Sequence, residues 1–236
     1  MAEDAIPIPG NAAKGAAAVA KRALRERMRA QRLALPAVER MRAAEAIVAP
    51  LLQLPEFQAP GYVAGYWATA GELPLHVLQL RLPAGVVWCL PCIQPDDSLR
   101  FAPWRPGDAL VSNRFGIPEP DMGADAQLDA ADMALVLLPL LAFSRTGQRL
   151  GMGGGFYDRT LAFRGDSGAP PRLVGVAYSA QELPTWSDEP WDVGLDAIAT
   201  ERGLVMPGAA AAGGAAEQAH PDHDADDTND SPTDRA

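Results

Sequence analysis

The hydrophobic positions of the chain form short apolar runs that alternate with segments of helical spacing. Apolar runs of this length, bounded by turn residues, are typical of buried strands, and they lie at 62–67, 85–93, 133–143 and 172–178. Helices are expected at 20–35, 38–52, 75–82 and 156–163. Strands that alternate with helices predict an α/β fold, here a single three-layer α/β/α domain with a mostly parallel central sheet.

The first expected helix is basic and amphipathic. Leu24, Met28 and Leu35 fall near one face, and cations line the others, namely Lys21, Arg22, Arg25, Arg29 and Arg32. Lys21 and Arg25 lie one turn apart, so both side chains can reach the same ligand. Composition alone favours a solvated basic face that binds no ligand.

Composition also separates the folded part from both termini. Residues 1–18 are rich in Ala, Gly and Pro, and 207–236 form a low-complexity acidic tail, so we expect disorder in both and a domain at 19–206. Much of the net charge of −10 lies in that tail, which has seven acidic residues and one arginine. This balance argues against nucleic-acid binding. No apolar run in the sequence reaches membrane-spanning length, and no secretion signal is evident, so we expect a cytoplasmic protein without a membrane partner.

Cys89 and Cys92 form a Cys-x-x-Cys pair in the predicted strand 85–93. Such a pair can be half of a zinc site or a redox motif. Residues three apart on a strand point to opposite faces, and the sequence has neither a second cysteine pair nor a histidine cluster. We therefore expect two reduced cysteines near a core strand and no site.

Candidate chemistry gathers at 147–159, where five of the thirteen residues are glycine. This segment follows the apolar run 133–143 and leads into the predicted helix 156–163. A strand, a glycine loop and a helix start in this order suit phosphate binding. Glycine lets the backbone approach an anion, and the first N–H groups of a helix have no intrahelical acceptor.

The two standard phosphate-binding loops do not match this glycine segment. It lacks the Gly-Lys-Ser/Thr end of a Walker A loop, and Phe156 stands where a dinucleotide fingerprint has its third glycine. A glycine-rich hairpin without a ligand would explain the glycines by themselves. The residues around them, Arg149, Tyr157, Asp158 and Arg159, favour a nucleotide that binds with a metal.

A carboxylate follows the predicted strand 62–67. Glu72 lies in the loop between this strand and the predicted helix 75–82, at the edge where open α/β sheets bind ligands. Taken alone, Glu72 could equally complement the charge of the helix start, and Trp67 at the strand end would be a core residue.

These segments together resemble the 5-formyltetrahydrofolate cyclo-ligases, also called 5,10-methenyltetrahydrofolate synthetases. The resemblance rests on Gly147 to Leu161 with the preceding Pro139 and Ala142-Phe143, on Lys21-x-x-Leu24-Arg25, on Gly71-Glu72 and on Gly116 to Pro120. It covers about residues 20–204. It implies ATP-driven cyclisation of 5-formyltetrahydrofolate to 5,10-methenyltetrahydrofolate, with release of ADP and phosphate and with Mg²⁺ as cofactor.

The resemblance also implies roles for individual positions. The implied ATP site comprises Lys21, Arg22, Arg25, Arg149, Leu150, Gly151, Met152, Gly153, Gly154, Gly155, Phe156 and Tyr157. The implied folate site comprises Trp67, Glu72, Met152, Gly153, Gly154, Gly155 and Phe156. Arg149 and Tyr157 are the expected catalytic residues, and Asp158 and Asp192 are the expected Mg²⁺ ligands.

Two other functions stay open. A sugar-phosphate isomerase on a related scaffold would use the glycine loop for a substrate phosphate and would need neither ATP nor metal. A folate- or nucleotide-binding module without catalysis is supported by Met152 and Ser144, where other family members carry a basic residue and an aspartate. In each case the ligands are small molecules, and we expect a monomer that binds no nucleic acid.

Overall fold

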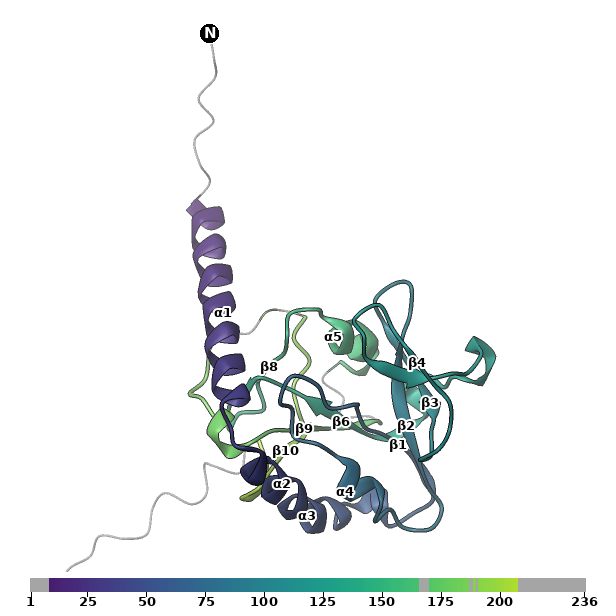
Figure 1. The fold of residues 1–236 in the computed structure, drawn as a ribbon. Coiled ribbons are helices and arrows are strands. Elements are labelled where there is room, and N and C mark those ends of the chain that lie inside the picture. The colour runs from purple at the N-terminus through teal and green to yellow at the C-terminus, as the bar shows by residue number, and fades with distance from the viewer. Residues whose placement is uncertain (1–8, 166–169, 187–188, 190, 208–236) are drawn as a thin grey trace, which may run out of the picture.

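The computed structural model describes residues 9–165, 170–186, 189 and 191–207. Its centre is a seven-stranded sheet in the order β11-β10-β9-β6-β1-β2-β3 (Figure 1). The strands are β1 Gly61–Ala64, β2 Val86–Ile93, β3 Leu99–Pro103, β6 Met133–Pro139, β9 Arg172–Val176, β10 Ala197–Thr200 and β11 Gly203–Val205. Strands β10, β9, β6, β1 and β2 are parallel, and the edge strands β3 and β11 pair antiparallel. The predicted mostly parallel sheet is confirmed.

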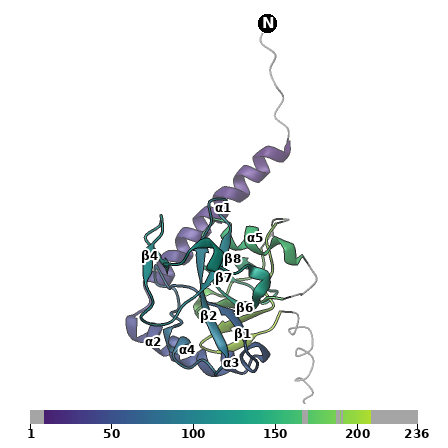
Figure 2. The ribbon, with the colours of Figure 1, turned by 90° about the vertical axis from the view of Figure 1, so that its right-hand side faces the viewer.

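Five α-helices are assigned in the described part of the chain, namely α1 Pro9–Leu33, α2 Ala37–Ala46, α3 Val48–Leu52, α4 His76–Gln79 and α5 Phe156–Leu161. Helices α2, α3 and α4 lie together on one side, away from α5, and α1 projects beyond the body (Figure 1, Figure 2). Short 3₁₀ turns are η1 Pro55–Phe57, η2 Ala124–Ala126, η3 Ala130–Asp132, η4 Ala162–Arg164 and η5 Ser179–Gln181. Two small hairpins complete the fold: β4 Leu110–Ser112 with β5 Pro118–Pro120, and β7 Ala142–Phe143 with β8 Arg149–Leu150.

Alternate residues of the central strands enter two hydrophobic cores. Val63 and Leu135 belong to the core that includes residues of α2, α3 and α4. Their neighbours Ala64 and Val136 belong to the second core, which includes Leu161 of α5. Each fully buried aliphatic side chain contributes about 1.5–3 kcal/mol. Because helices cover both faces of the sheet, the predicted three-layer α/β/α arrangement is confirmed.

Helix α1 starts much earlier than the pattern predicts. It begins at Pro9, so the prediction of disorder is wrong for residues 9–18. Alanine has the highest helix propensity and proline is tolerated in the first helical turn, so this alanine-rich segment continues the helix towards the N-terminus. Residues 1–8 and the part of the predicted acidic tail at 208–236 lie outside the described residues.

Proline divides two of the other predicted elements. The helix expected at 38–52 is interrupted at Ile47, because Pro50 has no N–H to donate to the carbonyl of Ala46. The apolar run 133–143 ends as a strand at Pro139 and re-forms as β7. The glycine loop therefore follows the β7–β8 hairpin rather than the long strand β6.

The predicted cysteine environment is confirmed. Cys89 and Cys92 are free and buried in β2, and burial raises the pKa of both thiols to about 12. In the described ranges, none of the helices has the length and hydropathy needed to cross a membrane.

Candidate active site

Helix α1 carries two predicted phosphate-binding cations, and one of them contacts the glycine loop. Arg25 Nε donates a hydrogen bond to the carbonyl oxygen of Gly151 at 3.1 Å, across 126 positions of sequence. A Cβ added to Gly153 would lie 3.5 Å from the same Nε. One turn earlier, Lys21 Nζ lies 3.2 Å from Glu189 Oε1 and 3.7 Å from Asp192 Oδ2. Gly151 of the glycine loop and the acidic residues Glu189 and Asp192 thus all contact α1.

Arg149 joins the strand before the glycine loop to the helix after it. Its Nη2 donates to Asp158 Oδ1 at 2.5 Å, and its Nη1 donates to the Val193 carbonyl oxygen at 2.6 Å. The Val193 N–H in turn donates to Asp158 Oδ1 at 3.2 Å. The Arg149 side chain is 7% exposed, so this pair is shielded from solvent on the arginine side.

The glycine loop between β8 and α5 has free backbone donors. Gly155 precedes α5 with φ +67°, and a Cβ on Gly154 would lie 2.5 Å from the ring of Phe156. Within the described part of the chain, the loop and turn hydrogen bonds do not use the N–H groups of Gly153, Gly154 or Gly155. Successive backbone N–H groups in such a loop can bind an anion.

Asp158 and Asp192, the predicted Mg²⁺ ligands, each face a cation. Asp158 Oδ1 accepts from Arg149, and Asp192 Oδ2 accepts from the Glu189 N–H at 3.0 Å and lies beside Lys21. Among the described residues, no group of three or more His, Cys, Asp or Glu side chains could hold a metal. Mg²⁺ usually takes one or two carboxylates together with phosphate oxygens and water. A Mg²⁺ site built on Asp158 and Asp192 would therefore need phosphate oxygens and water as its other ligands.

Glu72 lies in the loop after β1, as predicted, and both of its carboxylate oxygens have neighbours. Oε2 accepts the Thr69 N–H at 2.9 Å, and Oε1 lies 3.6 Å from Arg32 Nη1. Burial raises the pKa of Glu72, and the hydrogen bond from Thr69 and the charge of Arg32 oppose this effect. Burial, and then the charge of Glu72, also raise the pKa of Tyr157. The hydroxyl of Tyr157 in α5 therefore stays protonated at neutral pH.

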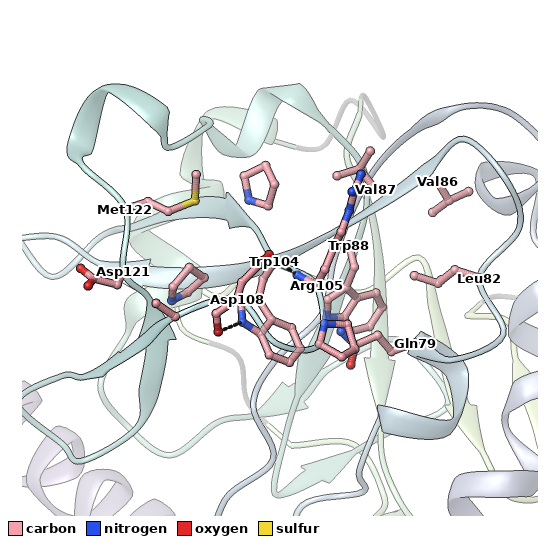
Figure 3. A pocket seen from close by; sticks show the side chains of 14 residues that line it. Gln79, Leu82, Val86, Val87, Trp88, Trp104, Arg105, Asp108, Asp121 and Met122 are labelled. Atoms are coloured by element: carbon pink, nitrogen blue, oxygen red, sulfur yellow. Dashed lines mark hydrogen bonds between the residues drawn. The ribbon is translucent and has the colours of Figure 1, made fainter.

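Trp67 is 37% exposed and meets the ring of Trp104 edge to face, with the ring centroids 5.7 Å apart. Trp104 also lines a cavity of about 550 Å³, together with Trp88 and Arg105 (Figure 3). Its Nε1 donates to the Asp108 carbonyl oxygen at 3.3 Å. None of the predicted site residues lines this cavity. Trp67 therefore contacts a residue of the cavity wall, Trp104, but does not itself line the cavity.

Aromatic side chains border the exposed side of the glycine loop. Phe156 meets Phe115 edge to face with the centroids 5.8 Å apart, and the Arg159 guanidinium lies 5.6 Å from the centre of the Phe156 ring. Phe115 and Met152 are both largely exposed. The predicted ligand-facing side chain of Met152 is thus exposed, whereas Phe156 is partly buried against the second core.

Two predicted ATP-binding residues have other surroundings. The Arg22 side chain is 83% exposed and pairs with Glu26 one turn later on α1. Leu150 is buried in a small core cluster with Met28, so its side chain serves packing. The structure does not bring either side chain to the open face of the glycine loop.

Three residues near Glu72 were missed by the sequence prediction: Arg32, Tyr66 and Tyr178. The Tyr66 hydroxyl donates to the Leu73 carbonyl oxygen at 2.6 Å, and the Tyr178 hydroxyl donates to the Glu72 carbonyl oxygen at 3.3 Å. Both tyrosines stabilise the loop that carries Glu72. A tyrosine at the end of an apolar strand looks like a core residue in the sequence, so no local signal identified them.

Comparisons with known proteins identify the family of this chain. The model of the 5-formyltetrahydrofolate cyclo-ligase family matches residues 17–201. The 5-formyltetrahydrofolate cyclo-ligase of Haemophilus influenzae is 33% identical over 176 residues, which cover 73% of this chain and 92% of that protein. The enzyme of the same name from Escherichia coli K12 is 38% identical over 141 residues, which cover 58% of this chain and 76% of that protein.

Solved structures show the same fold. The NMR structure of Aquifex aeolicus 5,10-methenyltetrahydrofolate synthetase has a TM-score of 0.68 and 30% identity, and the match covers 86% of this chain and 99% of that one. A 5,10-methenyltetrahydrofolate synthetase from Mycoplasma pneumoniae has a TM-score of 0.59 at 24% identity, covering 77% of this chain and 98% of that one. With its sequence matched over most of its length, this chain belongs to the 5-formyltetrahydrofolate cyclo-ligase family.

Proposed function

We propose that this protein converts 5-formyltetrahydrofolate to 5,10-methenyltetrahydrofolate with ATP and Mg²⁺, and releases ADP and phosphate. Family membership supports the reaction. The observation that carries the use of ATP is the arrangement of Lys21, Arg25 and Arg149 around the glycine loop. A polyphosphate is bound by several cations and backbone N–H donors together, and this loop has both.

The reaction has to convert the formyl oxygen into a leaving group. The γ-phosphoryl group passes to that oxygen, so a new P–O bond forms and the P–O bond to ADP breaks. The N10 nitrogen of the folate then attacks the formyl carbon and loses its proton. The oxygen departs with the phosphate, and the carbon stays bridged between N5 and N10. The protein has to align the formyl oxygen with the γ-phosphorus and neutralise the charge that develops between them.

On the nucleotide side, the N–H groups of Gly153, Gly154 and Gly155 would donate to phosphate oxygens. Lys21 and Arg25 would supply positive charge from α1. In this structure Lys21 forms ion pairs with Glu189 and Asp192. A polyphosphate that binds Lys21 would therefore displace its ion pairs within the protein. It would not bind an ammonium group that is surrounded by water.

Arg149 would stabilise the negative charge on the transferring phosphoryl group. Its ion pair with Asp158 fixes the direction of its guanidinium, so little reorganisation is needed during the reaction. Asp158 and Asp192 would hold Mg²⁺, which would neutralise phosphate charge. In this structure Lys21 lies beside Asp192 and Arg149 lies beside Asp158.

On the folate side, Glu72 would accept hydrogen bonds from the pterin ring, with Trp67 and Phe156 as apolar walls. Tyr157 follows the glycine loop in α5, and after burial the charge of Glu72 adds to the rise of its pKa. Its protonated hydroxyl would donate to the formyl oxygen. This contact would align the oxygen for phosphoryl transfer.

The test is absorbance-monitored formation of methenyltetrahydrofolate from 5-formyltetrahydrofolate, with ATP, Mg²⁺ and folate omitted one at a time. Product that requires all three components is the expected result. Tight binding of folate or ATP without product would favour the binding module. If the protein bound neither folate nor ATP, the result would favour the sugar-phosphate isomerase, in which the glycine loop binds the phosphate of a sugar.

A further inference from the structure

We propose that Arg32 is a positioning residue, which holds the Glu72 carboxylate so that both of its oxygens can accept from a ligand edge with two neighbouring N–H donors. The inference rests on the proposed function for the identity of the ligand, since the aminopyrimidinone ring of a folate has such an edge. The contact between Arg32 and Glu72 can be tested without any ligand.

Arg32 is a buried cation in the last turn of α1. It is 1% exposed, and it makes contacts with two different loops. Its Nε donates to the Ala70 carbonyl oxygen at 3.2 Å, and its Nη1 donates to the Leu140 carbonyl oxygen at 3.1 Å. Nη1 also lies 3.6 Å from Glu72 Oε1. One guanidinium therefore connects α1, the loop after β1 and the segment after β6.

The loop that carries Glu72 has an unusual backbone at the point where Arg32 meets it. Ala70 has φ +47° and Gly71 has φ +79°. A residue with a Cβ rarely adopts the first of these conformations, and the surrounding contacts must hold it there. The hydrogen bond from Arg32 to the Ala70 carbonyl is such a contact. Arg32 thus fixes both the turn before Glu72 and the carboxylate itself.

Stability alone gives a poor reason to bury this cation. A buried ion pair is often no more stable than apolar side chains of the same volume, since both charges lose their hydration. Arg32 Nη2 is buried and has no hydrogen-bond partner among the described residues, which adds a further cost. A cost of this kind is expected where the charge serves a ligand site.

The groups that face Glu72 explain what the charge does. Arg32 and Thr69 affect the pKa of Glu72. The charge of Glu72 in turn contributes to the raised pKa of three tyrosines, namely Tyr66, Tyr157 and Tyr178. Among these groups, Arg32 is the one that carries positive charge. Burial raises the pKa of Glu72, and Arg32 opposes that rise. Without Arg32 the acid is more readily protonated, and a protonated acid has one acceptor directed at a ligand instead of two.

The experiment uses Arg32→Gln, which removes the charge, and Arg32→Lys, which retains it. Arg27→Gln is the control, because Arg27 is an exposed arginine on the same helix. The first readout is an NMR titration of the Glu72 carboxyl carbon over about pH 3 to 9 without ligand. We expect a higher titration midpoint for Glu72 in Arg32→Gln than in the wild type, and midpoints near the wild-type value in Arg32→Lys and Arg27→Gln.

The second readout is calorimetric affinity for 5-formyltetrahydrofolate and, separately, for Mg-ATP. We expect Arg32→Gln to weaken folate binding about tenfold or more and to leave ATP binding within about twofold, because the lost contacts concern one charged hydrogen-bonding group. Folate affinity should rise with pH as Glu72 ionises, and in Arg32→Gln this rise should lie at higher pH than in the wild type. In a Glu72→Gln background, Arg32→Gln should cost little more.

An unchanged Glu72 midpoint in a folded Arg32→Gln variant would overturn the inference, and so would additive losses in the double variant. If Arg32→Gln fails to fold, the same titration of Arg32→Lys is the test. Because lysine keeps the positive charge, a Glu72 midpoint that differs from the wild type would contradict the inference. Failure of the proposed function has a different signature. The wild type would then show no affinity for the folate, while the titration would still report on Arg32 and Glu72.

Discussion

Arg149 and Asp158 form an ion pair across the glycine loop, with Nη2 and Oδ1 2.5 Å apart. The arginine comes from β8 and the aspartate from α5, so the pair closes the base of the loop between them. The two residues were assigned different tasks, phosphate and Mg²⁺ binding. Their contact means that each charge is already compensated before a nucleotide binds, and that substitution of either residue acts on the other.

Asp158→Asn is expected to lower ATP-dependent turnover about 100-fold, because the amide oxygen is a poor Mg²⁺ ligand and Arg149 loses its counter-ion. The melting temperature should change by only a few degrees, since the amide oxygen can still accept from Arg149 and from the Val193 N–H. Turnover and melting temperature are measured on the same preparation. Asp125→Asn, at an exposed position in η2, is the control. Turnover of Asp158→Asn within about twofold of wild type would remove Asp158 from the metal site.

Arg25→Gln is expected to raise the KM for ATP about tenfold with little change in the KM for folate. The substitution removes a charged donor that contacts Gly151, and hydrogen bonds of charged groups contribute about 1.5–3 kcal/mol. Steady-state kinetics with each substrate varied in turn separate the two constants. Arg27→Gln on the exposed face of α1 is the matched control. Equal changes in both constants would indicate a general disturbance of α1 instead of a phosphate contact.

Local patterns predicted the strands, the glycine loop and the position of Glu72, because each depends on a few neighbouring residues. They failed for the buried face of α1. Arg25, Met28 and Arg32 follow Lys21 by four, seven and eleven positions, so all four lie on one helical stripe. A hydrophobic pattern assigns arginine and lysine to solvent, so it placed Met28 on the apolar face but separated it from Lys21, Arg25 and Arg32.

The ion pairs of the site have no signature in the sequence. Lys21 meets Glu189 across 168 positions, and nothing near either residue indicates the other. Such pairs depend on how the sheet brings distant loops to one edge. The same holds for Tyr66 and Tyr178, which support Glu72 from the ends of different strands and have the composition of core residues.

Gly154→Ala is expected to reduce turnover more than it reduces stability. The added Cβ would lie 2.5 Å from the Phe156 ring, so the ring or the loop has to move. Because the loop is at the surface, the cost in unfolding free energy should be about 1 kcal/mol, whereas the displaced N–H groups should lower kcat/KM for ATP at least tenfold. Gly123→Ala, where a Cβ meets no atom within 4 Å, is the control. A larger loss of stability than of activity would contradict a phosphate role for the loop.

Cys89 and Cys92 are expected to resist thiol reagents in the folded protein. Their pKa values are raised by burial to about 12, so almost no thiolate is present at pH 8. Unfolding returns the thiols to a lower pKa, so the folded state loses relative stability as the pH rises above the unfolded value and up towards 12. Labelling with a chromogenic disulfide should be slow at pH 8 and complete in denaturant. Rapid labelling of both thiols in the native protein would show that β2 opens readily.

Trp67→Ala is expected to weaken folate binding about tenfold while leaving ATP binding unchanged. The indole is partly exposed and rests edge to face on Trp104, so it presents an apolar surface that a planar ring can cover. Trp67→Phe retains an aromatic face and should restore most of the affinity. Leu80→Ala is the control for the loss of exposed apolar surface, because Leu80 is an exposed apolar residue directly after α4. Calorimetry gives both affinities, and quenching of tryptophan fluorescence by the folate should diminish in Trp67→Phe. Equal folate affinity in all three variants would show that the pterin ring does not contact Trp67. Glu72 and Phe156 would then remain as its proposed contacts.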